Sequence, residues 1–300
     1  MKTASVIIPH YNDAPRLRLC LDALSRQTLP SDAFEVIVVD NNSTSPPREL
    51  VEGYPFCRFT SETRAGSYAS RNRGLEVASG RVLAFTDSDC LPEPGWLEAG
   101  VARVTRGPAP GQVGGAIQVF PADGAAPTAA ELYDMLYGLR QEVNVGSFRF
   151  AATANMFTTR EVFDAVGLFN PNLKSGGDFE WGRRVADSGR PVVYAPEAVV
   201  RHPARRALGD LLRQARRHMG GHVDKFHEKS GNKSIGRLTR NLWRIASPPV
   251  GESRDAVKQL RQRGYSLRQA TGVVGVVFAI KYVRLIEVAK RFAGAQAERQ

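Results

Sequence analysis

The sequence predicts an α/β protein with a doubly wound, mostly parallel sheet flanked by helices. Up to Cys90, short apolar runs rich in β-branched residues alternate with segments of helical periodicity. Repeated β–α–β units of this kind form parallel sheets with right-handed crossovers. With 42% hydrophobic and 24% charged residues over 300 positions, the composition is that of a globular protein with a sizeable core. A disordered chain is therefore excluded.

The first half gives the clearest elements. A strand over 5–8 is ended by Pro9, and the helix that follows begins near Asp13, which is a suitable N-cap. The strand over 34–39 is an apolar, β-branched run that leads into a polar loop. The same reasoning predicts, in order, a short helix over 48–52, a weak strand over 57–60, a helix over 67–78 and a strand over 82–86.

The regular alternation pauses over 103–127, because that stretch is rich in Gly, Pro and Ala. Beyond it we expect a helix over 129–141, a strand pair or bent strand over 148–158, a short helix over 161–166, a Gly-rich loop over 170–177, a helix over 178–188 and a strand over 192–194. The remainder is expected to be helical and basic over 208–226, 235–245 and 270–292, with a break at Pro248 and Pro249.

The net charge of +11 is unevenly distributed. Residues 1–200 carry 19 Lys and Arg against 23 Asp and Glu, a net of −4, whereas residues 201–300 carry 22 against 7, a net of +15. A basic terminal third suggests contact with a polyanion such as nucleic acid, anionic lipid or an acidic substrate. The first residues lack the apolar stretch of a secretory signal, which predicts a cytoplasmic protein, and three widely spaced cysteines predict reduced, mostly buried thiols.

Carboxylates directly follow two of the predicted strands. Asp40 comes after the strand over 34–39, and Asp87 and Asp89 come after the strand over 82–86. Ligands of open parallel sheets gather beyond these carboxyl ends. Two carboxylates at i and i+2 can converge on one hard cation, and oxygen ligands favour Mg²⁺ or Mn²⁺. The alternative is that Asp87 and Asp89 only cap the turn.

A third acidic cluster opens the helix predicted over 178–188. Asp178 and Glu180 point about 200° apart on a helix, so they cannot both face one ligand. Asp178 lies where the Gly-rich loop meets the helix start, which favours it as a general base. The alternative is that Asp178 is an N-cap and that Glu180 complements the helix dipole.

Seven segments and a late histidine occur in the order seen in glycosyltransferase family 2. They are VIIPHYN at 6–12, VIVVDNNS at 36–43, RNRG at 71–74, ASG at 78–80, FTDSD at 85–89, ANM at 154–156, GDFEWGRR at 177–184 and His202. The resemblance covers residues 4–205. It implies the GT-A fold and inverting transfer of a sugar from a nucleotide-diphosphate sugar to an acceptor hydroxyl, in cell-envelope or polysaccharide glycan synthesis.

The resemblance also implies a division of the chain and roles for individual residues. Residues 1–205 would be the glycosyltransferase domain, with a nucleotide-sugar half over 1–102 and an acceptor half over 103–205, and 206–300 a basic helical region. The implied donor contacts are Pro9, Tyr11, Asn12, Asp40, Arg71, Asn72 and Asp87. Asp87 and Asp89 match the metal-binding Asp-x-Asp, and His202 can complete a Mn²⁺ or Mg²⁺ site. Asp178 matches the catalytic base, and the expected acceptor-side residues are Asn155, Glu180 and Trp181.

Two positions depart from the family pattern. Many members carry a second acid where Asn41 stands, and a Glu-Asp pair where this chain has Gly177 and Asp178. Asn41 can hydrogen-bond but contributes no charge, so the nucleotide and the sugar remain open. Trp181, where Leu is common, either packs in the core or offers an aromatic platform to a sugar ring. For His202, the alternative is a surface histidine beside Arg201 and Arg205.

Two other functions compete with this one. Sugar-phosphate nucleotidyltransferases resemble one another in a Gly-rich phosphate loop with a basic residue after the first strand, whereas here residues 10–13 read His-Tyr-Asn-Asp. A nucleic-acid-binding protein would use the basic tail, but no recognised binding motif accompanies it, so no nucleic-acid partner is expected.

The basic terminal region is instead expected to rest on the inner face of a membrane, where a glycan or lipid-linked acceptor is presented. Residues 270–280 are uncharged but span only 11 positions, whereas a transmembrane helix needs about 20. The segment therefore predicts an interfacial helix on anionic lipid. The alternative is a terminal helix whose apolar side docks on the catalytic domain.

Overall fold

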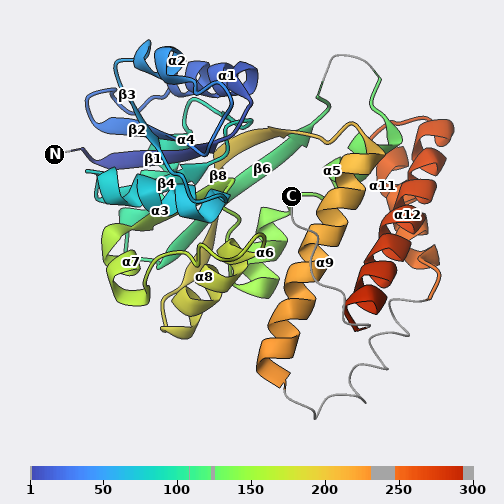
Figure 1. The fold of residues 1–300 in the computed structure, drawn as a ribbon. Helices are drawn as coiled ribbons and strands as arrows, with labels where there is room; N and C mark the ends of the chain where they lie inside the picture. Colours follow the sequence, from blue (N-terminus) through green and yellow to red (C-terminus); the bar gives the residue numbers. More distant parts are fainter. Residues whose placement is uncertain (1, 108, 123–125, 231–246, 293–300) are drawn as a thin grey trace. The chain divides into compact units, whose positions relative to one another are not determined.

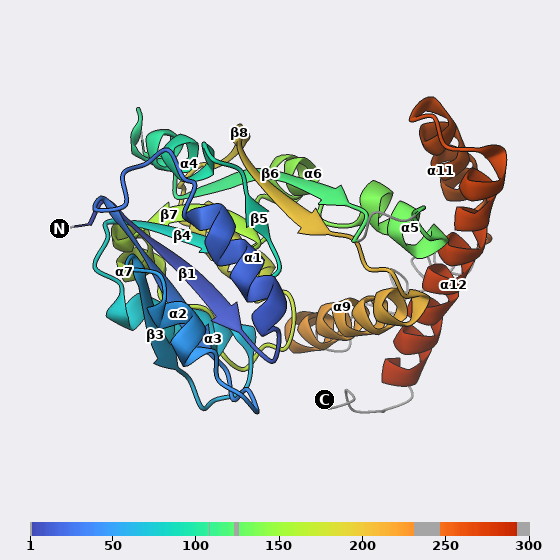
Figure 2. The same cartoon turned by 90° about the horizontal axis from the view of Figure 1, so that it is seen from above.

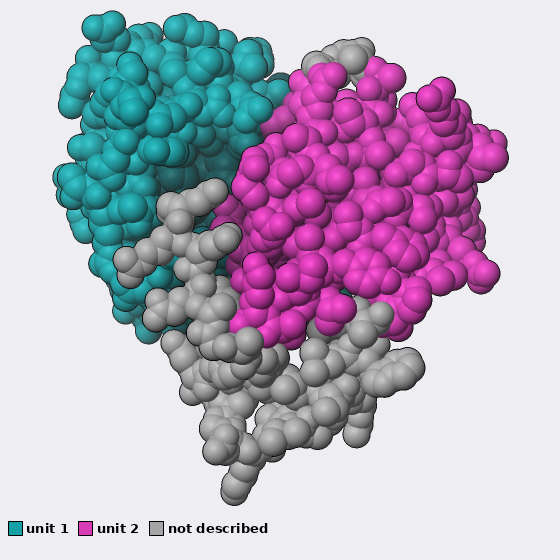
Figure 3. All heavy atoms as spheres, turned by 45° about the vertical axis from the view of Figure 1, so that its right-hand side comes forward, with its two compact units in different colours: residues 1–118, 139–202 teal, residues 119–138, 203–300 magenta. Residues whose placement is uncertain are grey.

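The computed structural model describes residues 2–107, 109–122, 126–230 and 247–292, which form two compact units. Unit 1 contains residues 1–118 and 139–202, and unit 2 contains residues 119–138 and 203–300 (Figure 3). The second unit is therefore assembled from two separate stretches of the chain. The helix expected over 235–245 lies outside the described residues.

An eight-stranded sheet runs in the order β3-β2-β1-β4-β7-β6-β8-β5 (Figure 1). The strands are β1 (Ala4–His10), β2 (Phe34–Asp40), β3 (Cys57–Ser61), β4 (Val82–Thr86), β5 (Leu91–Pro92), β6 (Gln112–Phe120), β7 (Asn155–Thr159) and β8 (Val192–Pro203). β1 pairs in parallel with β2 and β4, and β2 with β3, whereas β7 runs antiparallel to β4 and β6, and β5 to β8. The predicted α/β class is confirmed, with the parallel pairs gathered in the amino-terminal strands.

Helices cover both faces of the sheet, so its central strands are apolar on both sides. One face packs against α1 (Ala14–Leu24), α2 (Arg48–Glu52) and α4 (Trp96–Thr105); the other packs against α3 (Ser67–Val77), α6 (Gln141–Phe148), α7 (Arg160–Val166) and α8 (Gly177–Asp187) (Figure 2). Successive residues of β1 alternate between these layers: Val6 and Ile8 face the first and Ile7 the second. The carboxyl ends of β1, β2 and β4 consequently lie at one edge.

Several elements differ from the expected ones. The Gly-rich pause over 103–127 contains β6, in which Gly115 is required because a Cβ there would lie 2.3 Å from the Ala198 carbonyl oxygen. Gly138 ends the helix expected over 129–141, so that α5 (Ala129–Tyr137) and α6 form separately. β8 extends from the expected 192–194 to Pro203, which carries the chain past His202.

Unit 2 is a group of helices formed by α5, α9 (Leu208–Ser230), α11 (Val250–Gln262) and α12 (Leu267–Phe292). The uncharged part of α12 supplies its core. Val273 and Val277 pack with Leu132 and Leu260, while Ile280 packs against α5 and α9 in a second cluster. The apolar side of α12 thus docks on other helices of unit 2. Among the described helices, none carries an apolar stretch long enough to span a bilayer.

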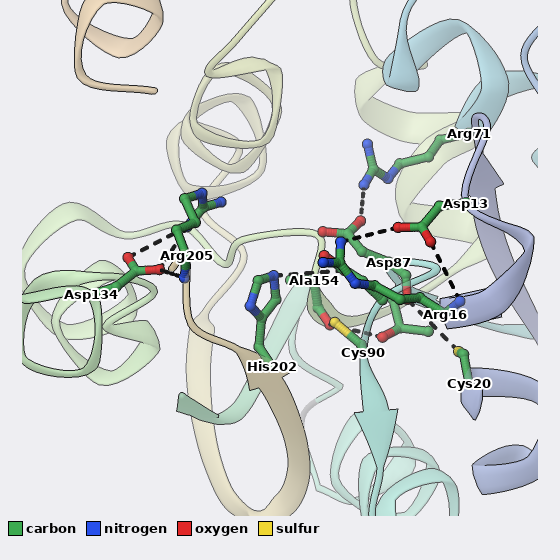
Figure 4. Close-up of polar contacts among 12 residues, drawn as sticks. Asp13, Arg16, Cys20, Arg71, Asp87, Cys90, Asp134, Ala154, His202 and Arg205 are labelled. Carbon is green, nitrogen blue, oxygen red and sulfur yellow. Dashed lines mark hydrogen bonds and ion pairs between the residues drawn. The ribbon is translucent and has the colours of Figure 1, made fainter. Parts of the chain in front are cut away.

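A buried carboxylate joins the two stretches of unit 2. Asp134 of α5 is 2% exposed and accepts hydrogen bonds from the backbone N–H of Arg205, at 2.9 Å, and from its guanidinium, at 3.1 Å (Figure 4). Thr128 and Glu131 form a capping box at the start of the same helix. These contacts fix α5 against the segment that leaves β8.

Candidate active site

An acidic turn follows β4 at the carboxyl edge of the sheet. Ligand atoms of Asp87, Asp89, Cys90 and His202 all lie within 4.8 Å of one another. β8 delivers the histidine: Leu91 pairs with Arg201, so the next residue reaches the turn, and its Nε2 is 3.7 Å from Asp89 Oδ1. In Figure 4, His202 points toward the turn that holds Asp87 and Cys90. His202 is 5% exposed, and is therefore not the surface histidine of the alternative reading.

The charges of this turn favour a bound cation. Burial raises the pKa of the Asp89 carboxyl, His202 opposes the rise, and the neighbouring Asp87 carboxylate adds to it. Burial also raises the pKa of the Cys90 thiol, whose Sγ points at the Ala154 carbonyl oxygen at 3.9 Å. A thiol is a soft ligand, which suits Mn²⁺ and Mg²⁺ less well than oxygen ligands do. Two carboxylates and one imidazole remain, a donor set that fits Mn²⁺ or Mg²⁺.

Arg71 of α3 reaches the same turn from the opposite side. Its Nη2 lies 2.5 Å from Asp87 Oδ1 (Figure 4). Its guanidinium is 5.7 Å from the centre of the Tyr68 ring. The residue is 3% exposed. Its Nε is buried and makes no hydrogen bond to any part of the chain that the structure describes. A buried, unpaired guanidinium donor beside an acidic turn is suited to an anionic ligand.

Asp178 lies in the first turn of α8, close enough to Arg71 and Asp87 for the charges to interact. Gly176, in a left-handed conformation with φ 70°, is the N-cap, so Asp178 does not cap this helix. Its Oδ1 accepts hydrogen bonds from the Phe179 N–H at 2.9 Å and from the Tyr68 hydroxyl at 3.3 Å. Burial raises the pKa of the Asp178 carboxyl, and these two donors partly offset the rise.

Tyr68 also accounts for one departure from the family pattern. Gly177 packs directly on the Tyr68 ring, and a Cβ at this position would lie 2.7 Å from ring carbons. A glutamate in place of Gly177 would displace the tyrosine. Sequence reasoning missed Tyr68, although it stands three residues before Arg71 and so shares a helix face with it.

Hydrogen bonds join the loops after β1 and β2, at the edge of the sheet where the sequence predicts the nucleotide. Asn12, with φ 48°, accepts hydrogen bonds from the backbone N–H of Thr44 at 2.9 Å and from its hydroxyl at 3.0 Å. Asp40 ends β2, is 2% exposed, and accepts from the Ser43 N–H. Pro9 lies within β1, and Tyr11 stands 63% exposed beside the loop.

Two amide side chains hold backbone segments. Asn41 donates to the carbonyl oxygens of Glu62 and Arg64 and accepts from the Gly66 N–H, which fixes the loop that leads into α3. Asn72 both donates to and accepts from the backbone of Phe169. Because their amides bind backbone, both residues position neighbouring segments.

The three expected acceptor residues do not converge on the acidic turn. Trp181 is fully buried, stacks on Phe163 at 4.5 Å and donates to the Gly167 carbonyl, so it packs in the core. Asn155 is fully buried and binds Trp96, Ala116 and Ala198. Glu180 pairs with Arg184 at 2.8 Å on the flank of α8.

Comparisons with known proteins agree on one family. Residues 5–167 match the family model described as glycosyl transferase family 2. Glycosyltransferase AglE of Haloferax volcanii is 37% identical over 215 residues, which cover 70% of this chain and 69% of that protein. A validoxylamine A glucosyltransferase of Streptomyces hygroscopicus is 36% identical over 114 residues, covering 36% of this chain and 27% of that protein.

Solved structures show the same fold. A mannosyltransferase of Pyrobaculum calidifontis, in complex with GDP-Man and Mn²⁺, superposes with a TM-score of 0.61 at 20% identity and covers 98% of this chain and 88% of that chain. S. aureus TarS in complex with UDP superposes with a TM-score of 0.54 at 18% identity, covering 99% and 93%. Both are similar to this chain along nearly its whole length.

Proposed function

Because the chain belongs to glycosyltransferase family 2, we propose that it transfers a sugar from a nucleotide-diphosphate sugar to an acceptor hydroxyl with inversion at the anomeric carbon. The observation that carries the proposal is the grouping of an acidic turn, a buried arginine and a carboxyl of raised pKa at the carboxyl edge of the sheet. This grouping provides both an anion-binding side and a base. The related structures bind GDP-Man and UDP, which supports a nucleotide donor.

The diphosphate of the donor is assigned to the acidic turn. Asp87, Asp89 and His202 would hold Mn²⁺ or Mg²⁺, which when bound neutralises charge on the leaving diphosphate. Arg71 has a buried Nε–H without a partner among the described residues and can donate it to a phosphate oxygen. Asp40, Asn12 and Tyr11 would border the nucleoside.

Asp178 is assigned the role of general base. The acceptor hydroxyl is a weak nucleophile, and attack in line with the leaving diphosphate requires removal of its proton on the opposite face of the sugar. A carboxyl of raised pKa accepts a proton more readily than an ordinary aspartate does. The Gly-rich loop before α8 would exclude water from the donor.

The proposal is tested with purified protein and a panel of nucleotide sugars, measuring donor binding and turnover with Mn²⁺, with Mg²⁺ and in excess EDTA. We expect one donor to bind and turn over only with metal; full activity in EDTA would contradict the metal assignment. Asp178→Asn should keep donor binding and lower transfer by about 100-fold or more. Asp187→Asn, at an exposed position of the same helix, is the matched control and should retain activity.

We further propose that unit 2 binds an anionic membrane surface on the cytoplasmic side, where a lipid-linked or cell-envelope acceptor is presented. α12 leaves Leu267, Tyr282 and Ile286 exposed on its outer side. Arg268 and Lys290, both exposed, lie on the same side of the helix as Ile286. Apolar side chains among basic ones on a helix suit the interface of an anionic bilayer.

Vesicle flotation tests this second proposal. The full chain should float with phosphatidylglycerol vesicles, less with phosphatidylcholine vesicles, and less at high salt because screening weakens the attraction. Tyr282→Ser with Ile286→Ser should reduce flotation, whereas Leu168→Ser, at an exposed apolar position of unit 1, should not. Equal flotation of all three proteins, or binding to duplex DNA in place of vesicles, would overturn the membrane assignment.

A further inference from the structure

His10, a buried histidine at the end of β1, lies directly against the carboxylate assigned to the nucleoside. Its Nδ1 is 3.2 Å from Asp40 Oδ1, and the backbone N–H of Asp13 donates to its Nε2 at 3.2 Å. The side chain of His10 is fully enclosed. The sequence pattern around residues 6–12 assigned roles to its neighbours and none to this residue.

The hydrogen bonds fix the tautomer of this ring. A backbone amide can only donate, so Nε2 must be an acceptor and carry no proton. The ring proton therefore lies on Nδ1, where it is donated to Asp40.

The ring also completes the support of Asp40. One carboxylate oxygen accepts the His10 Nδ1–H, and the other accepts the Ser43 N–H at 3.1 Å. His10 ends β1 and Ser43 lies in the loop after β2, both at the carboxyl edge of the sheet. Each carboxylate oxygen keeps a further lone pair, which an N–H or O–H group of a nucleoside would use. A carboxylate held by two fixed donors meets its ligand already oriented.

We propose that His10 is a positioning residue for the donor nucleoside, acting through Asp40. The inference rests on the proposed function, because it takes Asp40 as a nucleoside contact. It assigns His10 no part in the binding of the diphosphate or in the transfer of the proton, since the ring contacts neither Asp87 nor Asp178 in the described structure.

Two substitutions separate the two ring nitrogens. In His10→Asn the side-chain NH₂ can occupy the place of Nδ1 and keep a donor for Asp40. In His10→Gln the amide oxygen can occupy the place of Nε2 and keep an acceptor for Asp13, but the donor to Asp40 is lost. Each variant removes one buried hydrogen bond, so a purely structural role predicts similar effects of both.

The test measures the binding of UDP, GDP, TDP and CDP with Mn²⁺, and of pyrophosphate with Mn²⁺, to the full chain. For the nucleoside diphosphate that binds best, His10→Gln should weaken affinity about tenfold or more, the size of a lost charged hydrogen bond, and His10→Asn by about threefold or less. Pyrophosphate affinity should change in neither. With the matching nucleotide sugar, His10→Gln should raise KM more than it lowers kcat.

Val104→Ala is the control for lost stability. Val104 is fully buried in the core of unit 1, so its truncation lowers Tm while His10 and Asp40 keep their side chains. Equal nucleotide affinities of His10→Asn and His10→Gln, or parallel losses of pyrophosphate binding, would overturn the positioning role. If the wild-type protein binds none of the nucleoside diphosphates, the proposed function fails instead, so the two failures are distinguishable.

Discussion

Tyr68 and Arg71 stand one turn apart on α3, and through them this helix contacts both the acidic turn and Asp178, the proposed base. The tyrosine hydroxyl donates to Asp178, its ring lies beside the Arg71 guanidinium, and Gly177 packs against the ring without a side chain. A glycine at 177 is therefore the complement of a tyrosine at 68. At the scale of single residues, each departure from the family pattern is accompanied by a neighbouring group in the structure that fits it.

Tyr68→Phe should change the pH dependence of the reaction. The hydroxyl donates to the charged form of Asp178, so its loss raises further a pKa that burial has already raised. Because the base must be ionised, the acid limb of the pH–rate profile should move to higher pH, with little change on its plateau. Tyr265→Phe, which removes a tyrosine hydroxyl from unit 2, should leave the profile in place. An unshifted acid limb in Tyr68→Phe would show that the tyrosine does not act on the base.

Asn41→Asp, which restores the acid common in the family, should destabilise this protein. The carboxylate would face the carbonyl oxygens of Glu62 and Arg64, to which the Asn41 amide now donates at 2.8 and 2.9 Å. Loss of two hydrogen bonds with added repulsion should lower the free energy of unfolding by about 1–3 kcal/mol in denaturant titrations. Asn42→Asp loses a single donor, to Thr63, and should cost less. A larger effect at Asn42 would contradict this account.

Glu35 joins several elements on the parallel side of the sheet. From β2 its carboxylate accepts hydrogen bonds from Ser5 of β1, from the backbone and hydroxyl of Ser79 before β4, and from Arg58 of β3. Burial alone would raise the pKa of this carboxyl, but the donors hold it at about 2. At the scale of elements, one charged group thus fixes the spacing of three neighbouring strands.

Glu35→Gln should lower the free energy of unfolding at neutral pH by about 2 kcal/mol, because the amide cannot accept from all of these donors. The wild-type contribution is present above the ordinary pKa of 4.5 and is lost as the pH falls from there to about 2. The difference between the two proteins should therefore narrow over that interval. Glu76→Gln, at an exposed ion pair with Arg73, should show neither effect in the same urea titrations.

At the scale of the whole molecule, the two units have separate cores. The core of unit 2 depends on Leu132, Leu260 and Val277, which come from both of its stretches. Removal of α12 would take away much of this core, so point substitutions on its exposed side test membrane binding more cleanly than truncation does.

Leu132→Ala should cost about 2–5 kcal/mol in unit 2, because the side chain is fully buried among helices. Hydrogen exchange should accelerate in α5, α11 and α12, while nucleoside-diphosphate binding by unit 1 is kept. Val104→Ala, at a fully buried position in the core of unit 1, should accelerate exchange in α4 and its neighbours instead. Uniform acceleration over the whole chain in both variants would contradict separate cores.

The sequence predicted the parallel strands and the acidic turn because these depend on local periodicity and on the ends of strands. β6 was missed because its Gly114 and Gly115 lower the local β-strand signal, while the need for a glycine arises from contact with Asn155 and Ala198. The hydrogen bonds of Tyr68 and His10 join residues 110 and 30 positions apart, so spacing along the chain could not reveal them. The sequence allowed Trp181 either to pack in the core or to bind a sugar ring. Its contacts in the folded protein, which the sequence does not show, place it in the core.

α5 precedes the whole second stretch of unit 1 in the sequence, which has a consequence for synthesis on the ribosome. Leu132 and Leu136 emerge long before Ala256, Leu260 and Val277, the residues that cover them in the finished protein. At ordinary elongation rates of about 5–20 residues per second, the intervening stretch takes roughly 7 to 28 s to synthesise. During that time the nascent chain carries an uncovered apolar helix. A chaperone that binds short apolar segments would therefore bind this nascent chain until α12 has left the ribosome.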